Sequence, residues 1–117
     1  MMKRILVVDD NEMNMEIMST ILLESGYFVI EAKDGYEALN KIDSIDNLAL
    51  VLLDILMPGM SGYEVAASIR SKGINVPILA STANAFLEDK QKILECGMNG
   101  WLIKPIKMSI LDRKSVV

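Results

Sequence analysis

Histidine is absent from the 117-residue sequence, and cysteine occurs once, at Cys96. Without histidine the chain has no imidazole that could activate a nucleophile, bind a metal ion or carry a phosphoryl group. A single cysteine supplies neither a disulfide framework nor a thiolate cluster for zinc. The chemistry open to this chain is therefore that of carboxylates, lysine, serine and threonine.

Long hydrophobic runs and an excess of basic residues are also missing. Although 51% of the residues are hydrophobic, no run approaches the roughly 18 residues that cross a bilayer. A basic pair at positions 3–4 precedes an apolar segment, but Asp9 and Asp10 interrupt that segment too early for a secretory signal, so we expect a cytoplasmic protein without a membrane partner. The net charge of −4, without a basic stripe between aromatic residues, argues against direct binding of nucleic acid.

Five short apolar runs predict five strands. They cover residues 5–8, 27–30, 50–53, 76–80 and 100–103. The run at 50–53 is apolar at successive positions, which is typical of a strand covered on both faces in a parallel sheet. Because helix signals lie between the runs, we expect one α/β domain over residues 1–117, with a parallel sheet and helices on both of its faces.

The predicted helices are marked by capping residues and by glycines. The candidate N-caps are Asn11, Asp34 and Ser61, and the candidate stops are Gly26, Gly73 and Gly97. In the first helix, Met13, Ile17 and Ile21 recur every four residues as the apolar positions, beside Met18 and Leu22.

Two helices near the C-terminal end are weakly marked. The helix predicted at 87–96 has a thin apolar face, formed by Ile93 and Leu94. Such a helix is either weakly packed or kept exposed for a partner, and we favour weak packing. A short last helix is predicted around residues 106–111.

Chemically useful side chains follow four of the five predicted strands. They are Asp9 and Asp10, Asp54, Ser81 and Thr82, and Lys104. Because the carboxyl ends of parallel strands meet at one edge of a sheet, we expect these side chains to lie together. Two carboxylates about 4 Å apart repel by roughly 4 kcal/mol at an effective dielectric of 20, so three of them need a cation. Oxygen ligands without histidine or cysteine suit Mg²⁺, with Mn²⁺ as the alternative.

Asp54 is the candidate nucleophile of this group. It ends the apolar run at 50–53 and precedes the chain break at 58–59. A carboxylate beside Mg²⁺, an ammonium group and a hydroxyl is a suitable acceptor for a phosphoryl group. Lys104 would then screen the transferring oxygens and Thr82 would hydrogen-bond the phosphoryl group. The alternative is that Asp54 merely caps the following turn.

Four segments in this order and spacing resemble the motifs of the receiver domains of two-component response regulators. They are Val7-Val8-Asp9-Asp10, Leu53-Asp54-Ile55-Leu56-Met57-Pro58-Gly59-Met60-Ser61-Gly62, Ser81-Thr82-Ala83 and Lys104-Pro105. The resemblance covers nearly the whole chain. It implies a doubly wound, flavodoxin-like (CheY-like) fold with strand order 2-1-3-4-5 and a short last helix.

The resemblance also implies the partners and the metal ligands. A sensor histidine kinase or a histidine phosphotransfer protein would pass a phosphoryl group from its phosphohistidine to Asp54. Mg²⁺ would be bound directly by Asp10, by Asp54 and by the backbone carbonyl of Leu56, with Asp9 helping through water. The chain would be a signalling phosphoacceptor in a phosphorelay rather than an enzyme, with at most slow self-phosphorylation and self-dephosphorylation.

Further expectations follow from individual positions of the resemblance. Thr82 and Lys104 match the residues that contact the phosphoryl group, and Trp101 matches the aromatic residue whose rotamer switches with Thr82. Asn99 stands where an acid is frequent, which we expect to matter little. Leu56 is apolar at a position that tunes water access, which predicts a slow loss of the phosphoryl group. The downstream target, and whether phosphorylation causes homodimerisation, are left open.

Three other hypotheses compete with a phosphorylated receiver domain. A pseudo-receiver would bind a partner without phosphorylation, but it would have lost one or more of the candidate residues, and all of them are present: Asp9, Asp10, Asp54, Thr82 and Lys104. A phosphatase with an aspartyl nucleophile would need a second acid at position 56, where this chain has leucine. A flavin or nucleotide carrier would need a phosphate-cradling loop, which is missing. The segments 10–14 and 82–85 favour a receiver of the hybrid-kinase type.

Overall fold

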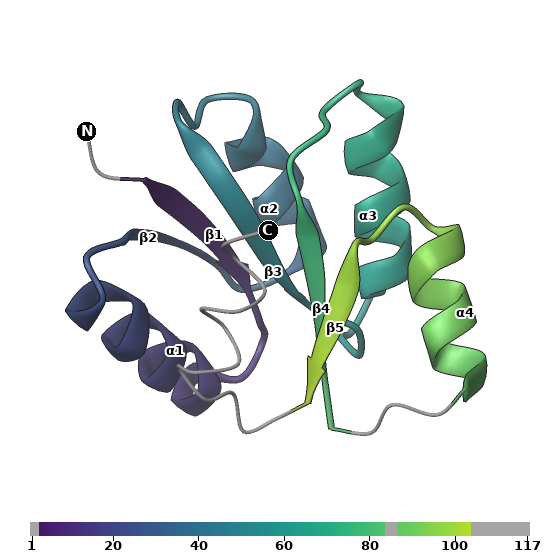
Figure 1. Ribbon diagram of the computed structural model, residues 1–117, viewed down its shortest axis with the longest axis horizontal. Coiled ribbons are helices and arrows are strands. Elements are labelled where there is room, and N and C mark those ends of the chain that lie inside the picture. Colours follow the sequence, from purple (N-terminus) through teal and green to yellow (C-terminus); the bar gives the residue numbers. More distant parts are fainter. Residues whose placement is uncertain (1–2, 84–86, 104–117) are drawn as a thin grey trace.

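The computed structural model describes residues 3–83 and 87–103 (Figure 1). Strands and helices alternate strictly along this part of the chain. In order they are β1 (Arg4–Val8), α1 (Glu12–Glu24), β2 (Phe28–Ala32), α2 (Gly35–Ile42), β3 (Leu48–Asp54), α3 (Gly62–Ser71), β4 (Ile78–Thr82), α4 (Leu87–Glu95) and β5 (Gly100–Ile103). None of the helices within these ranges is long and apolar enough to cross a membrane. The short last helix expected around 106–111 lies outside the described residues.

The strands of the described residues form one parallel sheet in the order β2-β1-β3-β4-β5. This confirms the fold class and the strand order expected from the sequence. The chain moves from β1 outward to β2, and then crosses back to place β3 on the other side of β1. The carboxyl ends of β1 and β3 are therefore the topological switch point of the sheet, where ligands bind in open α/β folds.

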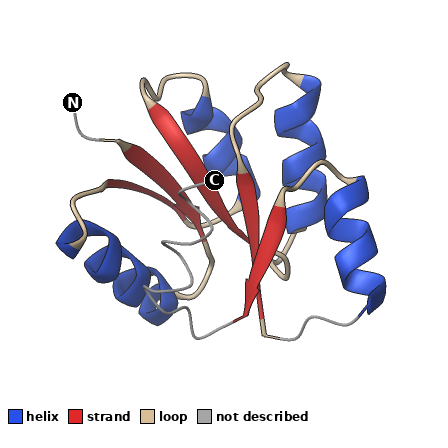
Figure 2. Cartoon of the chain, viewed as in Figure 1, coloured by secondary structure: helices blue, strands red, loops and turns tan. Residues whose placement is uncertain are grey.

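Helices cover both faces of the sheet, each over its own apolar core (Figure 2). Side chains of β3 alternate between the two cores, with Leu52 on the face covered by α1 and Leu53 on the face covered by α2, α3 and α4. Both side chains are buried. The run at 50–53 is apolar at successive positions because neither face of this strand meets water, as the sequence predicted.

The buried face of α1 differs from the expectation. Met13 is 70% exposed and Ile17 is 48% exposed, whereas Met15, Met18 and Leu22 are buried. A spacing of four residues describes a stripe along a helix, but it does not say which stripe faces the sheet. Here Met15, Met18 and Leu22, at positions i, i+3 and i+7, pack on the sheet. The expectation that Met13 and Ile17 belong to the apolar face that packs on the sheet was therefore wrong.

Strand bounds also differ from the expectation by a few residues. β4 was expected at 76–80 but spans Ile78–Thr82. Proline has no N–H to donate to a strand ladder. Pro77 takes part only through its carbonyl oxygen, which accepts the first hydrogen bond between β3 and β4, from Val51 N at 2.9 Å. The expected N-caps are confirmed. The side chains of Asn11, Asp34 and Ser61 each accept a hydrogen bond from the backbone N–H three residues later.

Arg70 in the last turn of α3 ties together the segments before β4 and β5. Its Nε donates to Gly97 O at 2.9 Å, its Nη1 to Ile74 O at 2.8 Å and its Nη2 to Asn99 Oδ1 at 3.0 Å. The same Asn99 oxygen accepts from Ile78 N at 2.9 Å. Asn99 therefore joins the start of β4 to the guanidinium group, a structural role that its sequence context does not suggest.

We expect Asn99→Ala to lower the free energy of unfolding by about 1–2 kcal/mol, because Ile78 N and the Arg70 guanidinium group lose their shared acceptor. Asn99→Asp keeps that acceptor and adds a charge opposite to that of Arg70. It should therefore unfold at a urea concentration at least as high as the parent chain. Urea denaturation followed by circular dichroism measures both variants. An equal loss in the two variants would contradict the role given to the side-chain oxygen.

Candidate functional site

Three aspartates meet at the carboxyl edge of the two central strands. Asp9 and Asp10 follow β1, and Asp54 is the last residue of β3. Because β1 and β3 pair in parallel, with Val8 opposite Leu53, the next residues of the two strands lie side by side. One oxygen of each carboxylate lies within 4.8 Å of the others. Asp9 and Asp54 are buried, at 2% and 5% exposure, and Asp10 is exposed.

Backbone N–H groups orient the two buried carboxylates. Asp9 Oδ1 accepts from Asn11 N at 2.9 Å, and Asp54 Oδ1 accepts from Leu56 N at 3.3 Å. Asn11 is also the N-cap of α1, so a single turn both starts the helix and holds Asp9. The carboxylates are thus held in place by the chain that follows each strand, and little reorganisation is needed when they bind a ligand.

Gly62 lets the first turn of α3 approach the backbone of Asp54 closely. Its N–H donates to Ile55 O at 2.9 Å. A Cβ at this position would clash with the carbonyl oxygen of Asp54 and would lie 2.8 Å from Ile55 Cα. The loop between Asp54 and Gly62 is therefore fixed at both ends, while the side chain of Leu56 inside it is 80% exposed.

The end of β4 places two hydroxyl side chains beside β3. Ser81 is the register partner of Asp54, and Thr82 is the next residue. Both are buried, and within the described part of the chain Ser81 Oγ has no hydrogen-bond partner. A buried hydroxyl without a partner costs free energy, so Ser81 is not explained by packing. Sequence reasoning placed it at the strand end but gave it no role.

Trp101 and Lys104 complete the set of residues predicted from the sequence. Trp101 lies on β5 opposite Ala80 of β4, and it is half-buried. The Nζ atom of Lys90 on α4 lies 5.2 Å from the centroid of the Trp101 ring. Lys104 lies outside the described residues, so its expected contact with the site stays a prediction.

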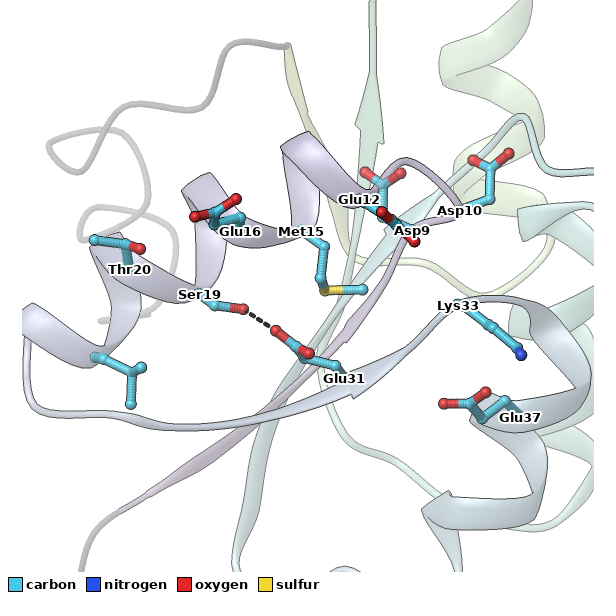
Figure 3. Close-up of a pocket in the computed structure, with 11 residues that line it drawn as sticks. Asp9, Asp10, Glu12, Met15, Glu16, Ser19, Thr20, Glu31, Lys33 and Glu37 are labelled. Carbon is cyan, nitrogen blue, oxygen red and sulfur yellow. Dashed lines mark hydrogen bonds between the residues drawn. The ribbon is translucent and has the colours of Figure 1, made fainter.

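An acidic cleft of about 450 Å³ runs from the aspartates along the groove between α1 and β2 (Figure 3). Its charged lining residues are Asp9, Asp10, Glu12, Glu16, Glu31, Glu37 and Lys33. Across the cleft, Ser19 Oγ donates to Glu31 Oε2 at 2.7 Å (Figure 3). Carboxylates lining one cleft raise the local concentration of cations and repel anions. This side of the site therefore favours the approach of a metal ion.

The donor set fits Mg²⁺. Three carboxylates with oxygens within 4.8 Å of one another repel one another, although solvent screens the charge of the exposed Asp10. A hard divalent cation removes that repulsion and takes oxygen ligands. Asp9, Asp10 and Asp54 can therefore hold such an ion. The Leu56 carbonyl, which is expected to bind the ion directly beside Asp10 and Asp54, belongs to the loop that follows Asp54.

Cys96 is not a second nucleophile. It follows α4 and precedes β5, at the edge of the sheet opposite the aspartates. Burial raises the pKa of its thiol, and Sγ donates to Ile93 O at 3.2 Å. A thiol with a raised pKa is protonated at neutral pH and reacts slowly.

Comparisons with known proteins agree with this geometry. A family model described as "Response regulator receiver domain" matches residues 5–114. The sensor histidine kinase RcsC of Escherichia coli K12 is 40% identical over 109 residues, which cover 93% of this chain and 11% of RcsC. The chain thus spans about a tenth of that relative's length.

Two solved structures connect the fold to phosphoryl chemistry. The response regulator TrrA of Thermotoga maritima, in complex with Mg²⁺ and BeF, is 39% identical with a TM-score of 0.85, covering 97% of this chain and 96% of that one. The receiver domain of Saccharomyces cerevisiae Ssk1, crystallised with the histidine phosphotransfer protein Ypd1, is 31% identical with a TM-score of 0.88, covering 98% and 87%.

We expect Asp10→Asn to raise the free energy of unfolding by about 1 kcal/mol in metal-free buffer, because it removes one of three charges that repel one another. The same variant should lose most of the stabilisation that Mg²⁺ gives to the parent chain, since binding to the folded state alone stabilises it. Urea denaturation with EDTA and with Mg²⁺ measures both effects. Asp46→Asn, at an exposed aspartate outside the cluster, is the control, and the same behaviour in both variants would contradict a metal site.

Proposed function

Because the chain belongs to the response regulator receiver family, we propose that Asp54 is its phosphoacceptor. The observation that carries the proposal is the position of Asp54. It ends a central strand at the switch point of the sheet, within 4.8 Å of the oxygens of Asp9 and Asp10. A carboxylate held among other carboxylates there is unfavourable for packing alone, and a phosphoryl acceptor with a bound cation accounts for it.

In the proposed reaction, a carboxylate oxygen of Asp54 attacks the phosphorus of a phosphohistidine. A P–O bond forms, and the imidazole leaves with the electron pair of the broken P–N bond and is protonated. Asp10, Asp54 and the Leu56 carbonyl would hold the cation, with Asp9 helping through water, and bound Mg²⁺ would supply positive charge beside the phosphoryl oxygens. Leu56 N keeps Asp54 Oδ1 in place through its 3.3 Å hydrogen bond. Thr82 and Lys104 contact the phosphoryl group once it has arrived.

The phosphoryl donor is a different protein or a different domain, because this sequence has no histidine. The relatives support a sensor histidine kinase or a histidine phosphotransfer protein as that partner. RcsC is named as a sensor histidine kinase, and the Ssk1 receiver was crystallised with a phosphotransfer protein. A donor that reaches Asp54 has to cover Leu56 and the start of α1, where Met13 is also exposed. These apolar side chains suit a protein donor.

Phosphorylation is proposed to act as a switch through Thr82 and Trp101. A phosphoryl group adds about 1.5–2 negative charges and three acceptor oxygens where only a carboxylate stood. Thr82 would turn its hydroxyl toward these oxygens, and Trp101 on the adjacent strand would change its rotamer. We further propose that the chain is a hybrid-kinase type of receiver in the cytoplasm, that Mn²⁺ can replace Mg²⁺, and that small phosphodonors phosphorylate it slowly.

Incubation with Mg²⁺ and acetyl phosphate should add one phosphoryl group to the intact protein mass. Asp54→Ala should remove this gain, and so should chelation of the metal, because both nucleophile and cation are needed. Asp46→Ala, at an exposed aspartate outside the cluster, should keep it. A gain that persists in Asp54→Ala would place the phosphoryl group elsewhere. No gain in the parent chain would favour the pseudo-receiver alternative.

We expect Leu56→Asn to speed the loss of the phosphoryl group several-fold, because an amide beside Asp54 can orient a water molecule and the leucine cannot. The Leu56 side chain is 80% exposed, so the substitution should leave the stability nearly unchanged. Intact mass recorded at intervals after removal of the phosphodonor gives the rate. Leu94→Asn, at a 55% exposed leucine on α4, is the matched control. An unchanged or slower rate in Leu56→Asn contradicts the role of Leu56.

A further inference from the structure

Few described side chains hold α4 against the rest of the protein. Ile93 is fully buried, whereas Leu94, which the sequence also assigned to the apolar face, is 55% exposed. The C-terminal end of α4 is anchored to α3, because Gly97 O, just after the helix, accepts a hydrogen bond from Arg70 Nε at 2.9 Å. Further toward the middle of α4, the described contacts with other elements include longer ones made by lysine side chains.

Two lysines of α4 lie over aromatic rings of two different neighbours. Lys90 Nζ is 5.2 Å from the ring centroid of Trp101 on β5, and Lys92 Nζ is 5.8 Å from that of Tyr63 on α3. Both distances lie within the range over which a ring attracts a cation. Residues two apart on a helix do not share a face, so the two contacts attach α4 to separate elements. β5 and α4 lie side by side (Figure 1).

The Lys90 contact reaches the proposed switch, and the Lys92 contact does not. Trp101 pairs in register with Ala80, two residues before Thr82 on the neighbouring strand. Tyr63 lies in the first turn of α3, beside the loop that follows Asp54, and has no part in the proposed rotamer change. A change in the Trp101 rotamer would move its ring relative to the ammonium group of Lys90, whereas the contact between Lys92 and Tyr63 does not involve the ring that is proposed to move.

We propose that Lys90 is a positioning residue that holds Trp101 in its unphosphorylated rotamer and so opposes switching. The inference rests on the proposed function of Asp54 and names a regulator of that site. Coupling between two sites is reciprocal. A contact that forms only in the resting state stabilises that state by some factor, and it weakens the binding of a phosphoryl mimic at Asp54 by the same factor. An exposed cation–π contact corresponds to a factor of roughly two to five.

Beryllofluoride with Mg²⁺ is the probe, titrated into the 117-residue chain and its variants. Lys90→Met removes the charge and keeps an apolar stem, so it should lower the half-saturating concentration by roughly two- to five-fold. Lys90→Arg keeps a cation over the ring and should restore the parent value. Lys92→Met removes an equivalent contact from Tyr63 and should leave the value unchanged. Fluorine NMR of the bound probe gives the affinity independently of the tryptophan.

Trp101 fluorescence supplies the second readout, since it is the one tryptophan of the sequence. Its emission before addition of the probe should change in Lys90→Met and not in Lys92→Met. An unshifted affinity in Lys90→Met, or equal shifts in the two methionine variants, would overturn the role of Lys90 while the phosphorylation of Asp54 stands. A parent chain that neither binds the probe nor gains a phosphoryl mass would overturn the proposed function, and this inference with it.

Discussion

Parallel pairing of β1 with β3 places the carboxylates at the carboxyl ends of the two strands next to one another, and the rest of the site depends on this contact. Asp9, Asp10 and Asp54 have oxygens within 4.8 Å of one another, and two of the three residues are buried. Their mutual repulsion opposes folding in the absence of a cation. The apolar cores on both faces of the sheet offset this cost, because burying even a few large aliphatic side chains contributes about 1.5–3 kcal/mol each.

Much of this arrangement could be predicted because its signals are local. The run at 50–53 is apolar at every position since β3 has a core on each face, and its end at Asp54 is visible from the proline and glycine that follow. Strand ends that carry carboxylates or hydroxyls mark one edge of a parallel sheet. The strand order was not read from periodicity. It came from the resemblance of four motifs to a known family, and the observed sheet has that order.

The features that were missed depend on contacts between residues far apart in the sequence. Periodicity along α1 identified a stripe containing Met13 and Ile17, but the direction of the sheet is set by strands elsewhere in the chain. The hydrogen bond between Arg70 and Asn99 joins positions separated by 29 residues. The acidic cleft between α1 and β2 combines glutamates that no local pattern relates to one another. Residue propensity and spacing along the chain carry no information about which side chains of distant elements meet.

The sequence left two alternatives open for α4, which were weak packing and exposure for a partner, and the two are compatible. Among the α4 side chains that the structure describes, Ile93 is the fully buried one, and a helix held by few buried side chains can move at small cost. The contact between Lys90 and Trp101 is worth about 0.5–1 kcal/mol at an exposed site, which is small beside the interactions that a new phosphoryl group with about 1.5–2 negative charges can make. Weak packing at α4 is therefore what would allow an event at Asp54, at the end of β3, to reach a distant surface of the molecule.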